Sequence, residues 1–566
     1  MYDARSTSTY RALMCQEIAE NVCEFLDPSY YHRGKSRHTD KYKSKEYKST
    51  LARLARTCKP LSDPALRVLW RRLDGINDLL QLLPQYTHPK PSTYWMAEPE
   101  LPKLLSAEPD DDGWTRLQSY AIRVRQLKFC DWARVDHSTW MILSKRCNEA
   151  PLFPLLKRLL DFNIRSSDCE GAIVRLLFPP SLRSVTLFFD SWFEDEEDPR
   201  PFRDILQDIV ARVPDVQHLA LGRGIGRCAS LHPITGLQST TSLSFAPDIS
   251  LDDVILAHCA SLPTLRDLSC RVHARHATKL PSMRGAFQLL TRISLHGSAE
   301  DIVWFFKETS VASLRDILLV FDRTVDTDEL LQSILEVLKV APRSLRKFSM
   351  KIIIARNSPE PISLIEAIEP LLGLRHLQEL TATSNHPFSL SAEDLIRMVT
   401  AWPDIHVLDI HDDRTRSALS VLPAHVLEQV AHRCPCLETL KLPRVDFTGL
   451  PPQAHEPVLD HDLVDLGFYP VTSSYHNDSD DEQEDSDSPG VVDWLNAALF
   501  IDRLFPRLDS DAEGAKLIMS DKSGTKLANL LSALRIGRRH AEAFDRMRVD
   551  SGGEPSCDSA RPPILS

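Results

Sequence analysis

Residues 403–410 read Pro-Asp-Ile-His-Val-Leu-Asp-Ile, in which a proline precedes three apolar residues in the order apolar-x-x-apolar-x-apolar. This apolar pattern occurs eleven times along the chain, and two degraded copies near residues 156–159 and 240–243 fill the gaps between matches. The twelve steps from residue 124 to residue 463 average about 28 residues, a period typical of stacked structural repeats. The full matches begin at Val124, Leu182, Val216, Leu265, Leu290, Leu314, Leu345, Leu377, Ile405, Leu437 and Leu463.

The segments before several matches predict a helix that ends near a proline. Helical stretches are expected over residues 201–213, 250–261, 391–401 and 423–433, and each leads into Pro-x-apolar. Within the third stretch, Ser391 and Asp394 have the spacing of a capping box. Because proline stops a helix and the next residues begin a strand, each repeat is predicted to be a helix, a tight turn and a short strand.

A short strand with one helix behind it cannot bury its own inner face, whereas a stack of such units shares one continuous core. The repeat resembles the leucine-rich repeat in an irregular form. We therefore expect an α/β fold, with parallel strands on the concave side of a solenoid and helices on its convex side. The solenoid is expected over residues 120–475, and a terminal repeat or cap over residues 491–535.

Residues 11–75 predict a module of three short helices. Within residues 13–27, Ile18, Val22 and Phe25 share one helix face, and Asp27-Pro28 stops that helix. A second helix is expected over residues 50–58, and a third after Asp63-Pro64, an N-cap residue followed by proline. Helices this short bury their apolar faces poorly in isolation, so one interpretation is a helical cap on the repeats.

The order of residues in this module resembles the F-box, and it is most similar to the fungal form of that family. The matching pieces are Glu17-Ile18 in a helix that ends in Phe25-Leu26-Asp27-Pro28, then the Leu54-Ala55-Arg56-Thr57-Cys58 helix, and then Trp70.

This resemblance implies docking on a Skp-type adaptor of a cullin ubiquitin ligase. A three-helix module of this size cannot bury all of its apolar side chains, and those left over are expected to form the docking patch. The candidate docking residues are Ile18, Val22, Phe25, Leu26, Leu51, Leu54 and Trp70.

A basic insertion with interleaved tyrosines occupies residues 29–49, between the first two helices. It has two interpretations: a segment that binds nucleic acid or directs nuclear import, or a solvated loop. Residues 76–119, which follow the third helix, are expected to be a linker.

The 566-residue chain carries 67 Lys and Arg against 79 Asp and Glu, so its formal net charge is −12. This charge disfavours a chain that binds nucleic acid mainly through phosphate contacts. We therefore expect no nucleic-acid partner. We also expect no membrane association, because no apolar run approaches the ~18 residues that span a bilayer. The twelve cysteines are expected to be free thiols in a cytoplasmic or nuclear protein.

No motif in the sequence predicts catalysis, and we expect no catalytic residue, metal or cofactor. Gly222, Gly224 and Gly226 follow a strand, but their spacing differs from that of a dinucleotide-binding loop. Cys434 and Cys436 flank a helix-stop proline, so structural thiols are favoured over a metal pair.

Two segments near the C-terminus are expected to be disordered. Residues 478–487 carry seven acidic residues in ten, so the segment 476–490 should be an extended acidic loop. The Ser-, Gly- and Pro-rich end, taken as residues 536–566, is expected to be a disordered tail.

Two hypotheses of function follow from these observations. The first is a non-catalytic substrate receptor, in which the F-box-like helices dock on the adaptor and the concave strand face holds a target protein. The second is a repeat scaffold for protein interactions without a role in ubiquitin ligation. The target-binding candidates have mixed charges, so a ligand of a single charge is not implied; they are Asp267, Arg292, Asp316, Lys347 and Glu379.

Overall fold

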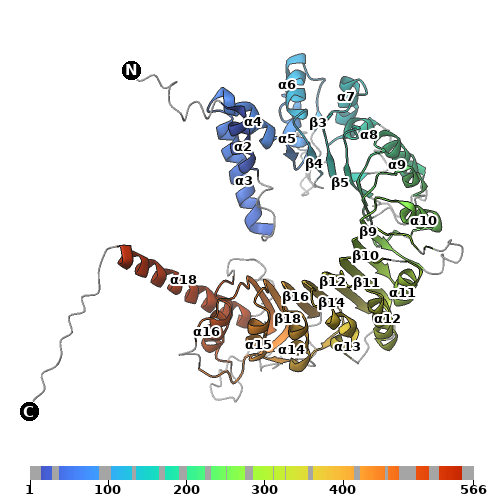
Figure 1. Ribbon diagram of the computed structural model, residues 1–566. Coiled ribbons are helices and arrows are strands. Elements are labelled where there is room, and N and C mark those ends of the chain that lie inside the picture. Colours follow the sequence, from blue (N-terminus) through green and yellow to red (C-terminus); the bar gives the residue numbers. More distant parts are fainter. Residues whose placement is uncertain are drawn as a thin grey trace, which may run out of the picture. The chain divides into compact units, whose positions relative to one another are not determined.

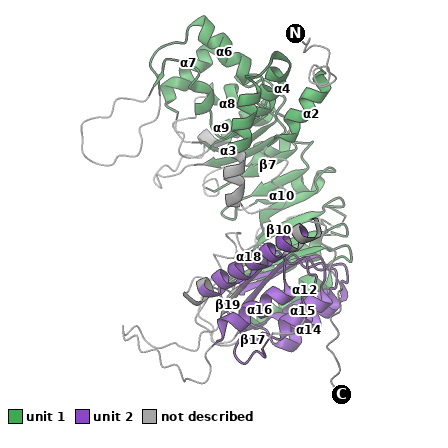
Figure 2. Ribbon diagram, turned by 90° about the vertical axis from the view of Figure 1, so that its left-hand side faces the viewer, with its two compact units in different colours: residues 1–360 green, residues 361–566 purple. Residues whose placement is uncertain are grey.

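The computed structural model divides into two compact units, residues 1–360 and residues 361–566 (Figure 2). The structure describes residues 15–27, 37–87, 104–129, 135–164, 172–189, 200–223, 231–249, 251–273, 283, 285–309, 311–324, 327–354, 361–412, 421–452, 457–470, 492–508 and 522–550. The acidic segment 476–490 lies outside these residues. Among the described helices, none combines the length and apolar character that a membrane span needs.

The first unit is built on one parallel sheet, in which each strand pairs with the next strand along the repeats. Every apolar motif and both degraded copies between residues 124 and 350 fall on or directly beside a strand, as predicted. The strands are β1 (Arg72–Leu73), β4 (Gln126–Lys128), β5 (Arg158–Ile164), β6 (Ser184–Phe189), β7 (His218–Leu221), β8 (Ser242–Phe245), β9 (Asp267–Arg271), β10 (Arg292–Gly297), β11 (Asp316–Thr324) and β12 (Lys347–Ile354).

Helices connect these strands and cover one face of the sheet (Figure 1). On β10, Ile293 and Leu295 are buried while Arg292, Ser294 and His296 are not, so the strand buries one face under the helices. We call the opposite face of the sheet the open face. The helices are α6 (Asp111–Ala121), α7 (His137–Cys147), α8 (Ala172–Leu177), α9 (Arg200–Arg212), η4 (His232–Gly236), α10 (Asp253–Ser261), α11 (Ala299–Glu308) and α12 (Thr327–Lys339).

The sheet begins earlier than the sequence predicted. Strand β1, at residues 72–73, pairs with β4, so the repeats start inside the expected helical module rather than at residue 120. The expected linker 76–119 also holds regular structure in its described part: α5 (Asn77–Leu80), and an antiparallel pair of two-residue strands, β2 (Tyr86–Thr87) and β3 (Leu104–Leu105). Such short strands carry too little apolar pattern to be detected in a sequence.

The second unit repeats the same architecture. Its main strands are β14 (Glu379–Ser384), β16 (Val407–Asp412), β18 (Thr439–Asp446) and β19 (Asp465–Pro470), paired in parallel in that order, and β17 (Leu422–Pro423) pairs with β18. A separate parallel pair joins β13 (Ile362–Ser363) to β15 (Phe388–Ser389). The helices are α13 (Leu364–Ile368), η6 (Glu369–Gly373), α14 (Ala392–Ala401), α15 (Val426–Arg433), α16 (Trp494–Leu504) and α18 (Lys522–Asp550). The predicted α/β class, with parallel strands backed by helices in leucine-rich-repeat style, is therefore confirmed in both units.

The helix boundaries in the second unit follow the predicted signals. Ser391 caps α14 in a full capping box with Asp394. Trp402 follows the helix as its C-cap; it is fully buried and donates its indole N–H to the carbonyl of Leu371 at 3.0 Å. Pro403 then turns the chain toward β16, as the repeat pattern predicts.

The expected disordered tail was wrong for residues 536–550, because α18 continues to Asp550. Leu527, Leu531 and Arg535 are buried at successive four-residue steps, and α18 packs against α16. The Arg535 guanidinium donates to the carbonyl of Leu508 at 2.6 Å. Arg538 of the same helix binds Asp502 of α16.

Replacing Trp402 with Ala should lower the unfolding free energy of the second unit by about 3–5 kcal/mol, because it leaves a large cavity and removes the indole hydrogen bond to the Leu371 carbonyl. Urea unfolding followed by hydrogen exchange in β14 and β16 measures this loss. The control is Leu495→Ala, at a side chain that is 52% exposed, which should change the free energy by no more than about 0.5 kcal/mol. Equal effects of the two substitutions would contradict the packing described here.

Acidification should destabilise the second unit through His461. Its buried ring has Nε2 2.9 Å from the carbonyl oxygen of Cys434, and Nδ1 accepts the N–H of Leu463 at 3.0 Å. Burial, opposed in part by the bond to Cys434, lowers the pKa of His461. Well above pH 6.5 the ring is neutral in both the folded and the unfolded chain, so it adds no pH dependence there. As pH falls below that value, the unfolded chain binds the proton first, and the unfolding free energy drops by up to about 1.4 kcal/mol per pH unit.

Hydrogen exchange in β18 and β19 between pH 7.5 and pH 5.5 measures this effect. The variant His461→Gln should lose this part of the pH dependence, whereas His376→Gln, at a ring that is 85% exposed, should keep it. An unchanged pH dependence in His461→Gln would exclude His461 as its source.

Candidate functional site

Three helices form the N-terminal module: α2 (Gln16–Phe25), α3 (Arg37–Leu54) and α4 (Lys59–Leu69). Both α2 and α3 contact α4. Their shared core is small and consists of Cys23, Leu51, Ala65 and Val68, with Leu26, Leu54, Ala55 and Leu69 packed around it. A core of this size leaves much of each helix surface outside it.

Two helix boundaries differ from the sequence prediction. Helix α3 begins at Arg37 rather than near residue 50, so much of the basic insertion 29–49 is helical and not a loop. Helix α4 begins at Lys59 with Cys58 as N-cap, and Asp63-Pro64 lies inside it. Pro64 removes one helical hydrogen bond, and its ring is buried. Asp63 is therefore not a cap, and its carboxylate faces two arginines instead.

The seven predicted docking residues separate into three groups. Ile18, Val22 and Phe25 are 42%, 42% and 63% exposed, and their i, i+4, i+7 spacing places them on one side of α2. We call these three residues the α2 stripe. Leu51 is fully buried and belongs to the core. Leu26, Leu54 and Trp70 are half-buried; Leu26 and Leu54 pack against the core, and Trp70 lies 4.7 Å from Tyr120, centroid to centroid.

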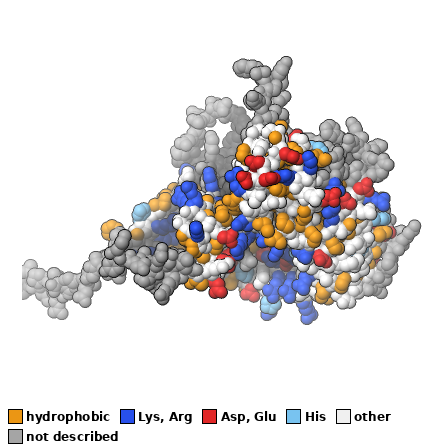
Figure 3. All heavy atoms as spheres, turned by 90° about the horizontal axis from the view of Figure 1, so that it is seen from above, with side chains coloured by type: hydrophobic (Ala, Val, Ile, Leu, Met, Phe, Trp, Pro, Cys, Tyr) orange, Lys and Arg blue, Asp and Glu red, His pale blue; other side chains and the backbone are white. Residues whose placement is uncertain are grey.

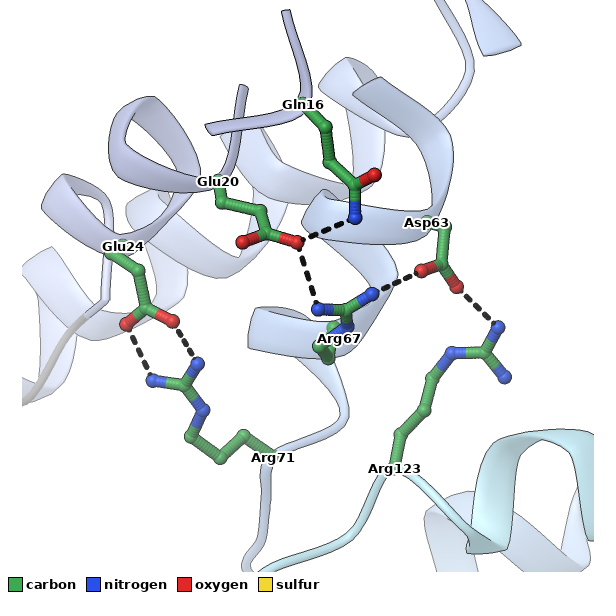
Figure 4. A network of polar contacts seen from close by, with 7 residues as sticks. All are labelled: Gln16, Glu20, Glu24, Asp63, Arg67, Arg71 and Arg123. Carbon is green, nitrogen blue, oxygen red and sulfur yellow. Dashed lines mark hydrogen bonds and ion pairs between the residues drawn. The ribbon is translucent and has the colours of Figure 1, made fainter. Parts of the chain in front are cut away.

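Polar contacts hold the opposite side of α2 against α4 (Figure 4). Arg71 binds both oxygens of Glu24, one of them at 2.6 Å, and also reaches Asp27 at 3.1 Å. One turn away, Arg67 donates to Glu20 at 3.0 Å and to Asp63 at 2.7 Å. Two acidic residues that are four positions apart on α2 thus pair with two arginines that are also four positions apart. The first arginine lies in α4 and the second just after it.

A further contact links this network to the first repeat. Arg123, which follows α6, donates to Asp63 at 2.7 Å. Hydrogen bonds from Arg123 and then Arg67 lower the pKa of Asp63, so the carboxylate stays charged near neutral pH. The backbone carbonyl of Arg71 also accepts the N–H groups of Arg125 and Gln126, both at 2.9 Å. Arg71 therefore connects α2 to β4 through its side chain and its backbone together.

Sequence reasoning did not identify this network. A signal was present, because Glu20 and Glu24 have the same four-residue spacing as Arg67 and Arg71. Complementary spacing of that kind indicates two helical segments that lie side by side. The sequence could not show which arginines α2 would meet, since the turn after α4 sets their direction.

The predicted target-binding residues of the first unit lie in one register. Asp267, Arg292, Asp316 and Lys347 begin β9, β10, β11 and β12 and pair with one another across the sheet. Arg292 binds Asp267 through two hydrogen bonds, of 2.7 Å and 2.6 Å. Glu379 begins β14 in the second unit.

In the second unit, β16 likewise buries Leu408 and Ile410 and leaves Asp409 and His411 on the other face, which we also call the open face. This face carries a charged group. Asp409 on β16 lies 2.7 Å from Nδ1 of His411 and accepts from Lys441 of β18 at 3.2 Å. These contacts overcome the opposing effect of burial and lower the pKa of Asp409. Across both units the open face is therefore of mixed charge. The face drawn in Figure 3 likewise shows hydrophobic side chains exposed beside Lys, Arg, Asp and Glu.

Two motifs with possible chemistry have structural explanations. A side chain at Gly222 would collide with the ring of Phe188, so close packing requires the glycine. Cys434 is buried, and burial raises the pKa of its thiol to about 12, whereas Cys436 is exposed. In the part of the chain that the structure describes, no group of three or more metal-ligating side chains is found.

Comparisons with known proteins find similarity to solved structures only. No protein-family model matches the chain, and no curated protein matches it. A chain of the Rad7 and Elc1 complex in yeast is 13% identical, with a TM-score of 0.28, over 77% of this chain and 88% of that one. The leucine-rich repeat-containing protein LegL7 from Legionella pneumophila is 13% identical, with a TM-score of 0.24, over 49% and 90%. A chain of the Toll–Spatzle complex of Drosophila is 13% identical, with a TM-score of 0.31, over 56% and 40%.

Replacing Arg71 with Leu should loosen α2, because it leaves Glu24 and the buried Asp27 without their guanidinium. The expected loss is about 1–2 kcal/mol, since Arg71 is partly exposed and solvent screens part of the attraction. Faster hydrogen exchange in α2, with unchanged exchange in β9 to β12, measures it. Lys48→Met, which removes an exposed ion pair with Asp74, is the control and should have little effect. If α2 exchanges at the same rate in both variants, Arg71 does not anchor it.

Proposed function

We propose that this chain is a non-catalytic substrate receptor of a cullin ubiquitin ligase. In this proposal the α2 stripe docks on a Skp-type adaptor, and the open face of the repeats holds a target protein. The observation that carries the proposal is the exposure of Ile18, Val22 and Phe25 on one side of α2, within a module whose sequence resembles the F-box.

The chemistry of the stripe supports docking in an apolar groove. Three large apolar side chains at i, i+4 and i+7 are the usual anchors by which a helix enters a partner's groove. Phe25 is the most exposed of the three, and burying an aromatic side chain contributes more than burying either aliphatic neighbour. An exposed apolar stripe beside a satisfied core is typical of a protein–protein interface.

The network behind α2 supports the same role, because it orients the stripe before any partner arrives. Glu20 and Glu24 are held by Arg67 and Arg71, and the helix therefore presents its apolar side away from α4. A pre-oriented helix loses less conformational freedom on binding, which favours affinity.

A receptor of this kind requires no catalytic side chain, since its work is to hold two proteins at a fixed distance. The target would lie on the open face, where Asp267, Arg292, Asp316, Lys347 and Glu379 supply charges of both signs. Mixed charges select a complementary protein surface rather than a uniformly charged polymer. The proposal places the chain in the cytoplasm or the nucleus, where it would meet the cullin complex.

Titration calorimetry of the full chain with a purified Skp-type adaptor tests the docking step. Phe25→Ala should weaken binding about 30-fold or more, because it removes the largest anchor of the stripe. The matched control is Phe544→Ala, which truncates a phenylalanine that is 73% exposed on α18 and should leave affinity unchanged within about twofold.

Circular dichroism of both variants should match the unchanged chain, since both side chains are exposed. Failure of the intact chain to bind any Skp-type adaptor would overturn the proposal. The repeats would then be a protein-interaction scaffold without a role in ubiquitin ligation. Equal losses in Phe25→Ala and Phe544→Ala would separate adaptor binding from the α2 stripe.

A further inference from the structure

Cations recur at one register position in the first repeats. The residue just before each strand is fixed there, because its carbonyl accepts two N–H groups from the next repeat. The backbone N–H groups of Lys157 and Arg158 donate to the carbonyl of Arg125 at 2.8 Å and 3.0 Å. The backbone N–H of Arg183 donates to the carbonyl of Lys157 at 2.9 Å. With Arg71 before β1, four cations therefore stand before four neighbouring strands.

A second row of cations lies next to the first. Arg72 of β1 pairs across the sheet with Gln126 of β4, and Gln126 pairs with Arg158 of β5. Neighbouring strands are about 4.8 Å apart, so β1 and β5 are separated by roughly 10 Å. We call Arg72, Arg125, Lys157 and Arg158 the cationic patch.

The patch has no ion pair with any carboxylate in the described part of the chain. Acidic residues nearby are engaged elsewhere: Asp74 with Lys48 at 2.9 Å and Asp161 with Lys128 at 3.3 Å. Arg125 donates to the backbone carbonyl of Ile122 at 2.6 Å, which leaves its positive charge uncompensated. Burial, followed by the charges of Arg71 and Arg67, lowers the pKa of Arg125, the direction expected where like charges crowd together.

Later repeats of the same unit differ at the corresponding position. There Asp267 and Asp316 alternate with Arg292 and Lys347 along the first strand residues, and Arg292 binds Asp267 directly. The first strand residues of β1, β4 and β5 include no acid. The position just before the strand carries a cation in later repeats too, at Arg266, Arg315 and Arg346. There, however, the acids Asp267 and Asp316 directly follow two of these cations, so the excess of positive charge over both positions is greatest in the first repeats.

We propose that the cationic patch binds an acidic peptide segment of a partner protein, through carboxylates paired with Arg72, Arg125, Lys157 and Arg158. Guanidinium groups form paired, charge-assisted hydrogen bonds with carboxylates, and the patch presents three of them with one ammonium. None of the four residues belongs to the α2 stripe or to the target-binding set, so the inference does not depend on adaptor docking.

Size and charge favour a peptide over a nucleic acid. Proteins that bind duplex DNA commonly neutralise about 6–10 phosphates, whereas this patch offers four cations over roughly 10 Å. The net charge of −12 would also repel a long polyanion while permitting a short acidic segment to contact one patch.

Fluorescence anisotropy of the full chain with a labelled twelve-residue peptide of alternating glutamate and serine tests the inference. Binding is expected in 50 mM salt, and it should weaken strongly in 300 mM salt. The double variant Lys157→Ser/Arg158→Ser should bind the peptide with an affinity that is at least about tenfold lower. Both side chains are exposed, so the fold should survive, and circular dichroism checks this.

The matched control is Arg315→Ser/Arg346→Ser, which removes the same charge at exposed positions before β11 and β12 and should leave binding unchanged within about twofold. No binding in 50 mM salt, or equal losses in both double variants, would overturn the inference. Tighter binding of a twelve-residue oligothymidylate, or of phosphatidylserine vesicles, would overturn it as well, because the patch would then serve a nucleic acid or a lipid surface.

Discussion

Every strand of the repeats depends on its neighbours, because a strand of a few residues with one helix behind it buries only one face. The repeats meet this constraint with a shared hydrogen-bond pattern: His406 and Val407 both donate to the carbonyl of Gln378, and Lys157 and Arg158 do the same to Arg125. Since this pattern fixes the register, equivalent motif positions form continuous columns across each sheet. Columns under the helices are apolar, and columns on the open face are free to carry charge.

The same constraint explains how much of the fold was visible in the sequence. Apolar positions at a regular spacing are required by the shared core, so the strands could be placed from Val124 onward. The capping box at Ser391 and the turn at Pro403 followed from local backbone chemistry. Strand β1 could not be predicted, because two residues are too few to show a periodic apolar pattern. The full length of α18 could not be predicted either, because most of its residues are polar and only Leu527 and Leu531 mark its buried side.

The N-terminal module was harder to predict, since tertiary contacts decide its details. Exposure of Ile18, Val22 and Phe25 was expected in general terms from the small size of the module. Which of the seven apolar residues would remain outside could not be predicted, because that depends on the direction in which Arg71 holds α2. Asp63 is the clearest example of a residue whose position could not be predicted. The sequence Asp-Pro favours a helix start, yet the helix begins earlier, with Cys58 as its N-cap, and the Asp63 carboxylate binds two arginines instead of capping the helix.

The position of α18 in the second unit has a consequence for the size of the array. Strand β19 pairs with β18 and with no further strand of the described chain, and an unpaired edge is a template for another strand. Helix α18 contacts β19 and packs on α16, while Arg538 binds the buried Asp502 of α16. A helix cannot supply the ladder of N–H and C=O groups that a strand offers, so lateral growth of the sheet stops there. The C-terminal helix thus covers the last repeat of the described chain with a surface that offers no hydrogen-bond ladder to a further strand.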